Sequence, residues 1–433
     1  MSKLNKKRWI YLAFVLLLSL FLITVTGCSG SGSSGGDKAT GDKTEGAASG
    51  DTINIGVLVP YTGELGAYGN YWYNGAKAAV DEMNANGGVL GKQIKIYTED
   101  SESSVEQGIR AAQKLVKANK VIAIHGTESS VAVAIYPFAK ESKVTIANPA
   151  GGSTRLDQMG PDYMFRTCPS DNFEGIVVAK MLKDAGFKSV AIMYENDESR
   201  ASSAAALTKE FEKLGGKVTS VVYAARQTSY LNELKKAFAD KPDAFFLAGG
   251  QESGATIIKE WYQRGYGGQL IVTADLTVPE FFTFVSPEAV EGAWGEMPMT
   301  DTNLPEYKQF AEIYKKYIGE APTGSYESNS YDAMIILGLA MEIAGEASGT
   351  AISEHYKDTS DPNGVVVTSF KQAVEEIKKG NKINYQGASG PCDFDKYGNV
   401  VGSYVKIIAK NGKWEQGDFY PASTFDDYIK SQQ

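Results

Sequence analysis

The stretch DTINIGVLVPYTGELGAYGNYWYNGAKAAVDEMNANGGVLGKQIKIYTED, Asp51–Asp100, decides the fold. Its first apolar run, Ile53–Val59, is typical of a buried strand in a parallel sheet. Apolar residues then recur at helical spacing, namely Ala76, Ala79, Val80 and Met83. Asn86-Gly87-Gly88 ends this helix, because glycine adopts the left-handed conformation that a helix C-terminus favours. A second strand begins at Ile94, so the stretch predicts half of a βαβ unit.

Ligands of open α/β sheets bind beyond the carboxyl ends of the strands. The loop Tyr61–Tyr68 follows the first strand and is therefore a candidate wall of a ligand site. Two further strands, Val121–Ile124 and Val144–Ala147, end in loops rich in Gly, Ser and Thr. From Ile176 onward strands and helices alternate again, which predicts a second α/β domain of similar design.

The C-terminal part has a different pattern. Apolar residues alternate within residues 393–410 on both sides of Asp395–Asn399. We interpret this pattern as a hairpin that turns at Asp395–Asn399.

Size and charge limit the possible functions. A chain of 433 residues is long enough for two domains, and its apolar content allows a sizeable core. The formal charge of −9 argues against a nucleic-acid-binding protein, which needs clustered Lys and Arg to neutralise phosphates.

The N-terminus predicts export. Basic residues in Lys3–Arg8 precede the apolar run Ile10–Val25, and Val25-Thr26-Gly27-Cys28 follows. This end resembles the lipobox of bacterial lipoproteins, so residues 1–28 form a predicted signal peptide with Cys28 as the lipidated residue; an uncleaved anchor is the alternative. Residues 29–51 are rich in Ser, Gly, Thr and Lys and predict a flexible tether.

Catalytic motifs are missing from the sequence. Outside the Ser- and Gly-rich run, where Gly32–Gly36 matches GxSxG by composition alone, it has no GxSxG motif, and it has no P-loop. Its two histidines, His125 and His355, lie far apart with no ligand cluster around them. We therefore expect no metal, no cofactor and no enzymatic activity. If Cys28 is lipidated, Cys168 and Cys392 remain, and an even number of cysteines in an exported protein favours a disulfide; two separate buried thiols are the alternative.

Several motifs together resemble one known family. They are Gly63, Ala67-Tyr68-Gly69, Asn74-Gly75-Ala76, Asn84–Gly88, Gly91, Asp100, Phe165-Arg166-Thr167, Pro169-Ser170-Asp171, Tyr331-Asp332-Ala333, Gly390-Pro391, Phe394-Asp395 and Gly398. The chain from Thr52 to about Lys413 is thereby similar to the branched-chain amino-acid-type substrate-binding proteins of bacterial ABC transporters.

The resemblance implies the fold of periplasmic binding proteins of type I. Its class is α/β, with two Rossmann-like lobes that have parallel central sheets and are joined by a three-segment hinge. Residues 52–166 and 300–390 would form lobe 1, and residues 167–299 and 391–433 would form lobe 2. On this mapping Cys168 and Cys392 both lie near the hinge, which strengthens the expectation of a disulfide.

The resemblance also implies how a ligand carboxylate is held. In amino-acid-binding members, hydroxyls and backbone N–H groups of lobe 1 bind it, and the loops Gly126–Ser130 and Ala150–Thr154 match those positions. Ser130 is the first candidate and Ser129 the second. Gly152 stands where a threonine is common, so Ser153 is a possible substitute.

The ligand ammonium and side chain would meet other residues. In such members an acid of lobe 2 holds the ammonium, and Asp275 is similarly placed. Tyr61, Tyr68 and Trp72 are candidates for the side-chain pocket, although Trp72 could equally pack at a helix start. Glu198-Ser199-Arg200 replaces a Tyr-Gly pair of the family, and Gln251 stands where an aromatic residue is common. Arg200 would either meet a second acidic group of the ligand or lie at the surface.

The predicted function is that of a solute receptor. It would be lipid-anchored on the extracytoplasmic side of the bacterial cell membrane, capture a small polar ligand such as an amino acid or related carboxylate, and deliver it to the permease of an ABC importer. The mechanism is closure of the two lobes around the ligand. The alternative is a sensor of the same fold that reports the ligand to a membrane receptor without transport.

Overall fold

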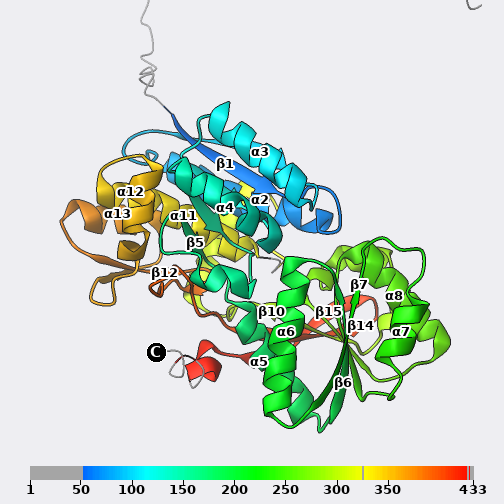
Figure 1. The fold of residues 1–433 in the computed structure, drawn as a ribbon. Helices are drawn as coiled ribbons and strands as arrows, with labels where there is room; N and C mark the ends of the chain where they lie inside the picture. Colours follow the sequence, from blue (N-terminus) through cyan, green and yellow to red (C-terminus); the bar gives the residue numbers. More distant parts are fainter. Residues whose placement is uncertain (1–51, 324–325, 427–428, 430–433) are drawn as a thin grey trace, which may run out of the picture. The chain divides into compact units, whose positions relative to one another are not determined.

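The computed structural model describes residues 52–323, 326–426 and 429. The predicted signal peptide, Cys28 and the tether lie outside these residues. Figure 1 shows the fold from β1 (Ile53–Val59) onward. Within the described part of the chain no single helix is long and apolar enough to cross a membrane, and one bent pair of helices, Glu327–Ala344 with Gly349–Thr359, passes that test by length and composition alone.

A five-stranded parallel sheet forms the centre of lobe 1. Its order is β2-β1-β3-β4-β5, with β2 at Ile94–Asp100, β3 at Ala123–Gly126, β4 at Thr145–Asn148 and β5 at Met164–Arg166. Successive residues of β1 point to opposite faces. Val57 and Val59 pack on one face with α2 (Gly66–Ala85) and α11 (Glu327–Ala344), whereas Leu58 packs on the other with α3 (Val105–Lys117) and α4 (Ser129–Glu141). The four apolar residues predicted to line one stripe of the first helix, Ala76, Ala79, Val80 and Met83, are all buried there.

The middle of the chain returns to lobe 1. Three more helices, α10, α12 and α13, and a small sheet of order β11-β12-β13 join it in this region. Their bounds are Pro305–Ile318, Gly349–His355 and Phe370–Lys378 for the helices, and Val365–Val367, Ile383–Gly387 and Gly390–Pro391 for the strands.

A seven-stranded sheet forms the centre of lobe 2, in the order β15-β14-β10-β9-β8-β6-β7. The parallel part contains β6 (Ser189–Glu195), β7 (Lys217–Tyr223), β8 (Ala244–Ala248), β9 (Gln269–Val272) and β10 (Trp294–Pro298). Helices α5 (Asp171–Asp184) and α6 (Glu198–Lys213) cover one face, and α7 (Leu231–Ala237) and α8 (Gln251–Arg264) cover the other. The short helix α9 (Pro287–Val290) precedes β10. The α/β class, two lobes and parallel sheets are therefore as predicted.

The edge of this sheet corrects one prediction. The C-terminal hairpin consists of β14 (Tyr404–Lys410) and β15 (Lys413–Tyr420), which are antiparallel and turn at Asn411-Gly412. Both turn residues have positive φ, 51° and 72°, as a tight Asn-Gly hairpin turn requires. Asp395–Asn399 is instead a local turn in which Asp395 accepts hydrogen bonds from the Tyr397 and Asn399 backbones, so the hairpin predicted there is wrong.

The predicted disulfide is also absent from the structure. Cys168 and Cys392 are both free and buried. Their environments differ, since Cys392 Sγ lies 3.6 Å from the carbonyl of Gly390 in its own loop and Cys168 lines a cavity next to Tyr326. Burial raises the pKa of Cys168 to about 12, so this thiol stays protonated at neutral pH.

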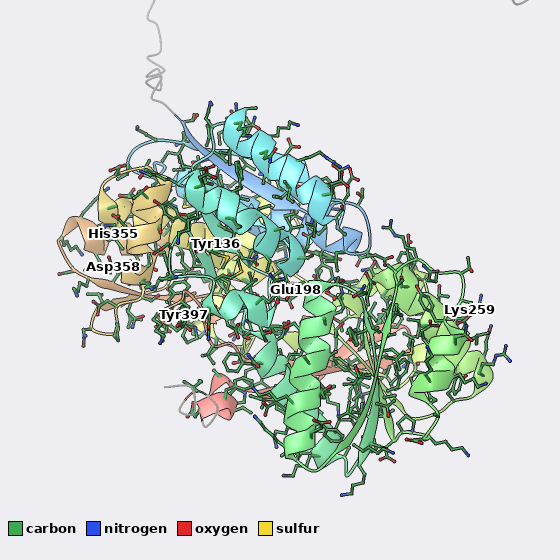
Figure 2. All side chains as sticks on the ribbon, in the orientation of Figure 1. Tyr136, Glu198, Lys259, His355, Asp358 and Tyr397 are labelled. Atoms are coloured by element: carbon green, nitrogen blue, oxygen red, sulfur yellow. The ribbon has the colours of Figure 1, made fainter. Side chains whose placement is uncertain are left out.

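The two histidines are accounted for by local contacts. His125 on β3 is fully buried and its Nε2 lies 2.7 Å from Ser330 Oγ, while burial lowers its pKa to about 3. His355 is partly exposed and pairs with Asp358 at 2.8 Å (Figure 2). No group of three potential metal ligands occurs in the described part of the chain.

Candidate ligand site between the lobes

The lobes meet through direct hydrogen bonds near the carboxyl ends of their strands. Ser153 of lobe 1 donates from Oγ to Glu198 of lobe 2 at 3.0 Å, and Thr154 N donates to Ser202 Oγ at 2.9 Å. Arg155 adds an ion pair with Glu198 at 2.8 Å, and Glu198 is labelled in Figure 2. The lobes are therefore in contact, and a ligand that binds between them is covered on both sides.

The loop after β1 and the start of α2 contribute a second set of contacts. Tyr68 donates its hydroxyl to the carbonyl of Ala274, and Tyr71 donates to Glu280 at 2.6 Å. Glu64 accepts from Arg226 at 3.3 Å and its carbonyl accepts from Gln251 N at 3.4 Å. Gln251 and Tyr68 thus hold the lobes together.

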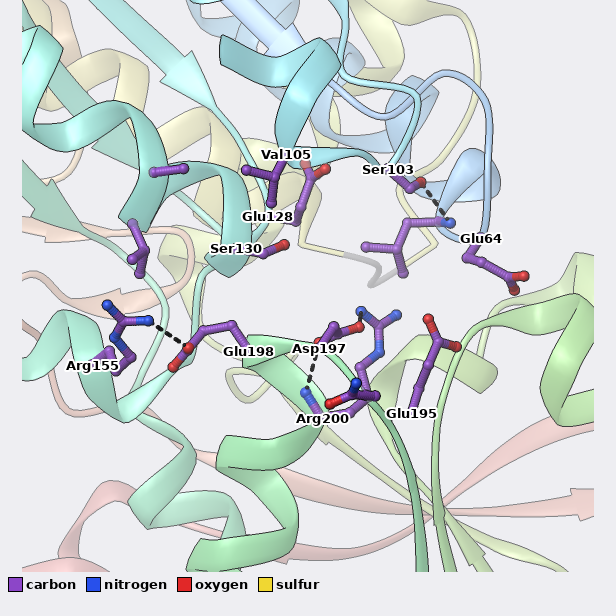
Figure 3. Close-up of a pocket in the computed structure, with 14 residues that line it drawn as sticks. Glu64, Ser103, Val105, Glu128, Ser130, Arg155, Glu195, Asp197, Glu198 and Arg200 are labelled. Carbon is purple, nitrogen blue, oxygen red and sulfur yellow. Dashed lines mark hydrogen bonds and ion pairs between the residues drawn. The ribbon is translucent and has the colours of Figure 1, made fainter. Parts of the chain in front are cut away.

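An outer pocket of about 420 Å³ opens between the two lobes. Figure 3 shows acidic side chains on both of its sides. Five carboxylates line it, against the two cations Arg155 and Arg200; they are Glu64, Glu128, Glu195, Asp197 and Glu198. Burial raises the pKa of Glu128 to about 7, although Ser101 donates a hydrogen bond to it at 2.9 Å. Ser130 lines this pocket as well.

An inner cavity of about 40 Å³ lies deeper between the lobes. Ala150 and Gly152 line it from lobe 1, and Thr273, Ala274 and Asp275 line it from the end of β9 in lobe 2. These are loops at the carboxyl ends of strands in both sheets, where ligands of this type of fold bind. The segment Asp197–Arg200 contributes to both spaces, because Arg200 lines the outer pocket and Ser199 lines the inner cavity.

Arg200 is the residue that links the two spaces. Its exposed fraction is 5%, so the alternative of a surface residue is wrong. Nη1 pairs with Asp197 at 2.7 Å, and Nε lies 3.0 Å from Asp275 Oδ2. Burial alone would lower the pKa of Arg200, but Asp197, Asp275 and Glu195 raise it well above its usual value. Nη2 is buried and has no hydrogen-bond partner among the described residues.

The lobe 1 loops satisfy most of their own polar groups. Asn148 Oδ1 accepts from the backbone N–H groups of Ala150 at 3.0 Å and Gly151 at 2.6 Å. Ser129 Oγ accepts from Ser153 N at 3.1 Å. The predicted carboxylate donors Ser129 and Ser153 are therefore engaged within the protein, and Ser130 retains the freer hydroxyl.

The remaining predicted residues have mixed positions. Asp275 lines the inner cavity, at the end of β9, but is ion-paired with Arg200. Trp72 is buried and packs edge-on against Tyr326 with 6.4 Å between ring centres, so it is a packing residue behind the cavity. Tyr61 packs against Tyr73 at 6.3 Å and lines neither of the two spaces.

Sequence reasoning missed four residues here: Asp171, Glu174, Glu296 and Tyr326. Asp171 and Glu174 begin α5 and line the inner cavity with Tyr326, which has a left-handed φ of 67°. Such a conformation is costly for a tyrosine and is often found at functional sites. Glu296 could have been noticed from the sequence, because it is a charged residue between the apolar residues Trp294 and Met297 of β10.

The surroundings of Gly152 leave no room for a side chain. A Cβ atom at Gly152 would lie 2.0 Å from Asp171 Oδ1. The carboxyl group of Asp171 therefore occupies space that a side chain at position 152 would need.

Two α/β lobes with a polar cavity between their strand ends define a binding protein that encloses a small solute. The sequence profile of the family described as periplasmic binding protein matches residues 52–396, and the chain belongs to this family. It has the fold of periplasmic binding proteins of type I, is similar to the branched-chain amino-acid-binding proteins, and is a solute-binding protein of the ABC-transporter type; the family consists of binding proteins and not of enzymes.

Three relatives illustrate this assignment. The chain is 28% identical over 314 residues to the Leu/Ile/Val-binding protein BraC3 of Rhizobium johnstonii, covering 71% of this chain and 83% of that one. It is 25% identical over 370 residues to the chemotactic signal transduction substrate-binding protein BasB of Halobacterium salinarum, covering 82% and 87%. The crystal structure of the leucine-binding protein LivK from Thermotoga maritima has a TM-score of 0.75 at 26% identity, covering 86% of this chain and all of that one.

Proposed function

We propose that this protein captures a small amino compound, of the amino-acid class, between its lobes and delivers it to the permease of an ABC importer. The observation that carries the proposal is the inner cavity, which loops from both lobes line, together with the hydrogen bonds that join the lobes at the adjacent Ser153 and Thr154. Ligand contacts to both lobes would supply the free energy that favours closure. The relative BraC3 is described as a binding protein for Leu, Ile and Val, which supports the amino-acid class.

The proposed binding mode differs from that expected of the family. Because Ser129 and Asn148 already accept from the lobe 1 amides, the ligand carboxylate would pair with Nη2 of Arg200, with Ser130 adding a hydroxyl. The ligand ammonium would lie against Asp275, whose carboxyl group would then pair with both the ammonium and Arg200. Buried charges need such partners, since an unpaired ion in a protein interior is unstable.

The division into lobes 52–166 with 300–390 and 167–299 with 391–433 is part of this proposal. Membership of the strands in the three sheets supports it, because β1–β5, β11 and β12 lie within the ranges of lobe 1 and β6–β10, β14 and β15 within those of lobe 2, while β13 spans the third crossing. Attachment to the membrane through a lipidated Cys28, with residues 29–51 as a tether, rests on the sequence pattern.

A panel of ligands tests the proposal. Purified protein would be screened by thermal shift against amino acids, amines and neutral sugars, because a ligand that binds only the native state raises the melting temperature. We expect amino compounds to raise it and sugars to leave it unchanged. A response confined to sugars would contradict the amino-acid class.

A sensor function is the second candidate, and its support is the similarity to BasB, which is described as part of a chemotactic system. The two functions differ in what deletion of the gene removes. Transport predicts that a deletion strain loses uptake of the radiolabelled ligand. A sensor predicts normal uptake and loss of the response to that ligand.

A further inference from the structure

The inner cavity is lined by carboxyl groups, and those of Asp171 and Glu174 have no ion-pair partner among the described residues. Asp171 and Glu174 line it together with Asp275, and Glu296 lies behind Ala274, whose N–H it accepts at 3.0 Å. The exposed fractions of Asp171, Glu174 and Glu296 are 6%, 8% and 0%. No Lys, Arg or His is among the described residues that line the cavity.

Each of these three carboxyl groups has one oxygen left over. Glu174 accepts from Ser203 at 3.1 Å through one oxygen, and Glu296 uses one oxygen for Ala274. The other oxygens, and Oδ2 of Asp171, are buried and have no hydrogen-bond partner in the described part of the chain. Thr273 also lines the cavity, and its Oγ1 is likewise buried with no hydrogen-bond partner among the described residues. Buried polar atoms of folded proteins are rarely left unpaired, so a cluster of them indicates a missing partner.

The electrostatic effects of these groups on one another show that they lie close together. Burial raises the pKa of Glu296 to about 8 and that of Asp171 to about 7. Asp171 also raises the pKa of Glu296, and both groups raise the pKa of Glu174. Burial, Glu296 and Asp171 raise the pKa of Glu174 well above its usual value. Arg166 and Ser202 offset the effect on Asp171 only in part. Arg200 does not neutralise the cluster, because it is engaged by Asp197 and Asp275.

The aromatic wall of the cavity suits a cation as well. Tyr326 lines the cavity, and its ring packs edge-on against Tyr68 at 6.2 Å and Trp72 at 6.4 Å. Electron-rich ring faces attract ammonium and guanidinium groups. The acidic outer pocket would in addition draw a cation toward the site from solution.

The size of the cavity indicates which part of a ligand it accepts. A volume of 40 Å³ corresponds to about three water-sized groups. That is the size of an ammonium-bearing end group, and its lining of carboxyl and hydroxyl groups does not match a branched aliphatic side chain.

We infer that the ligand carries a second positively charged group, an ammonium or guanidinium at the end of an aliphatic chain, which the inner cavity receives beside Asp171 and Glu174, with Glu296 behind its Ala274 wall. This inference rests on the proposed function and narrows it to basic amino acids and the corresponding diamines. Basic amino acids and diamines share the terminal cation, but only the amino acids carry the carboxylate that Arg200 would bind.

The experiment compares matched probes by calorimetry at pH 7.5. L-Lysine and L-norleucine differ in the terminal ammonium alone, and cadaverine is lysine without its carboxylate. We expect L-lysine to bind at least about thirtyfold more tightly than L-norleucine, the ratio typical of a buried ion pair. Tighter binding of cadaverine than of lysine would assign the site to diamines, and the reverse to basic amino acids; either supports a second cation.

Two isosteric variants locate the effect. Glu174→Gln and Glu296→Gln should each reduce the preference for lysine over norleucine by tenfold or more. Glu212→Gln, an exposed position on α6, is the matched control and should leave it unchanged. If a variant fails to fold, the ratio of the affinities of the wild-type protein for lysine and norleucine still tests whether the site binds a second cation.

The outcomes separate the inference from the proposed function. Norleucine or leucine binding as tightly as lysine would overturn the inference and leave the proposed function standing. If no amino compound binds, the proposed function fails and the inference fails with it.

Discussion

The two lobes face the site between them in different ways. The lobe 1 loops after β3 and β4 satisfy their own polar groups, because Asn148 and Ser129 accept from the amides that would otherwise bind an anion. Lobe 2 presents unpaired atoms at the same place, on Arg200, Glu174 and Glu296. Lobe 1 therefore acts as a preformed wall, and lobe 2 carries the charges that select the ligand.

Removal of the Arg200 charge should have the largest effect. Arg200→Gln leaves Asp197 and Asp275 without their cation in a buried place, and breaking such a pair costs about 3–5 kcal/mol of the free energy of unfolding. Urea unfolding measures this loss. Arg155→Gln is the control, because Arg155 is 61% exposed and its pair with Glu198 should contribute about 0–1 kcal/mol. Equal losses in the two variants would contradict the assigned role of Arg200.

Restoring the threonine of the family at position 152 should also be unfavourable. In Gly152→Thr the new Cβ meets Asp171 Oδ1, and overpacking of this kind costs about 1–3 kcal/mol. The double variant Gly152→Thr with Asp171→Ala should recover most of the loss, which a double-mutant cycle measures. A threonine tolerated without Asp171→Ala would mean that the carboxyl group does not occupy this space.

The acidic cluster should make stability depend on pH. The pKa of Glu296 is raised to about 8 and that of Asp171 to about 7, from about 4.3 and 3.9 in an unfolded chain. Their protonated forms fit the folded state, so this stability is complete below about pH 4 and is lost as pH rises through 7 to 8. The melting temperature of the ligand-free protein should fall between pH 6.5 and 8.5, and Glu296→Gln should flatten the slope. His125 acts oppositely and below this window, since its lowered pKa of about 3 removes stability as pH falls below about 6.5.

The smallest effect concerns the preformed wall. Ser129→Ala removes the acceptor for Ser153 N and should cost about 1 kcal/mol of the free energy of unfolding. Ser130→Ala, at a half-buried neighbour, should change it by less than about 0.5 kcal/mol. A larger loss of unfolding free energy in Ser130→Ala than in Ser129→Ala would contradict the structural role given to Ser129.

The fold could be predicted from the sequence because its signals are local and repeated. The strand Ile53–Val59 and the helical stripe at Ala76, Ala79, Val80 and Met83 required only their own periodicity. The position of the hairpin is not predicted correctly, because apolar residues alternate around Asp395 as they would in a hairpin. The Asn411-Gly412 turn is the stronger hairpin signal, and it is where the strands turn.

The site could be predicted only in part, since it depends on which side chains meet across the lobes. Asp275 and Gly152 were found because they follow strands. That Asp171 fills the space beside Gly152 follows from packing across the first crossing between the lobes. That Glu296 on β10 lies close to the carboxyl groups at the start of α5 follows from packing of elements more than a hundred residues apart. The spacing of residues along the sequence does not show such contacts between side chains of different elements.

The most direct test of the account is the proton exchange that accompanies L-lysine binding. Calorimetric titrations at pH 7.5 in two buffers with different ionisation enthalpies give the number of protons released. Because the carboxyl groups around the inner cavity hold protons when no cation is present, we predict net proton release in the wild type and much less in the Glu174→Gln, Glu296→Gln double variant. Binding of L-lysine without proton release, or with proton uptake, would contradict a cation site at these carboxyl groups.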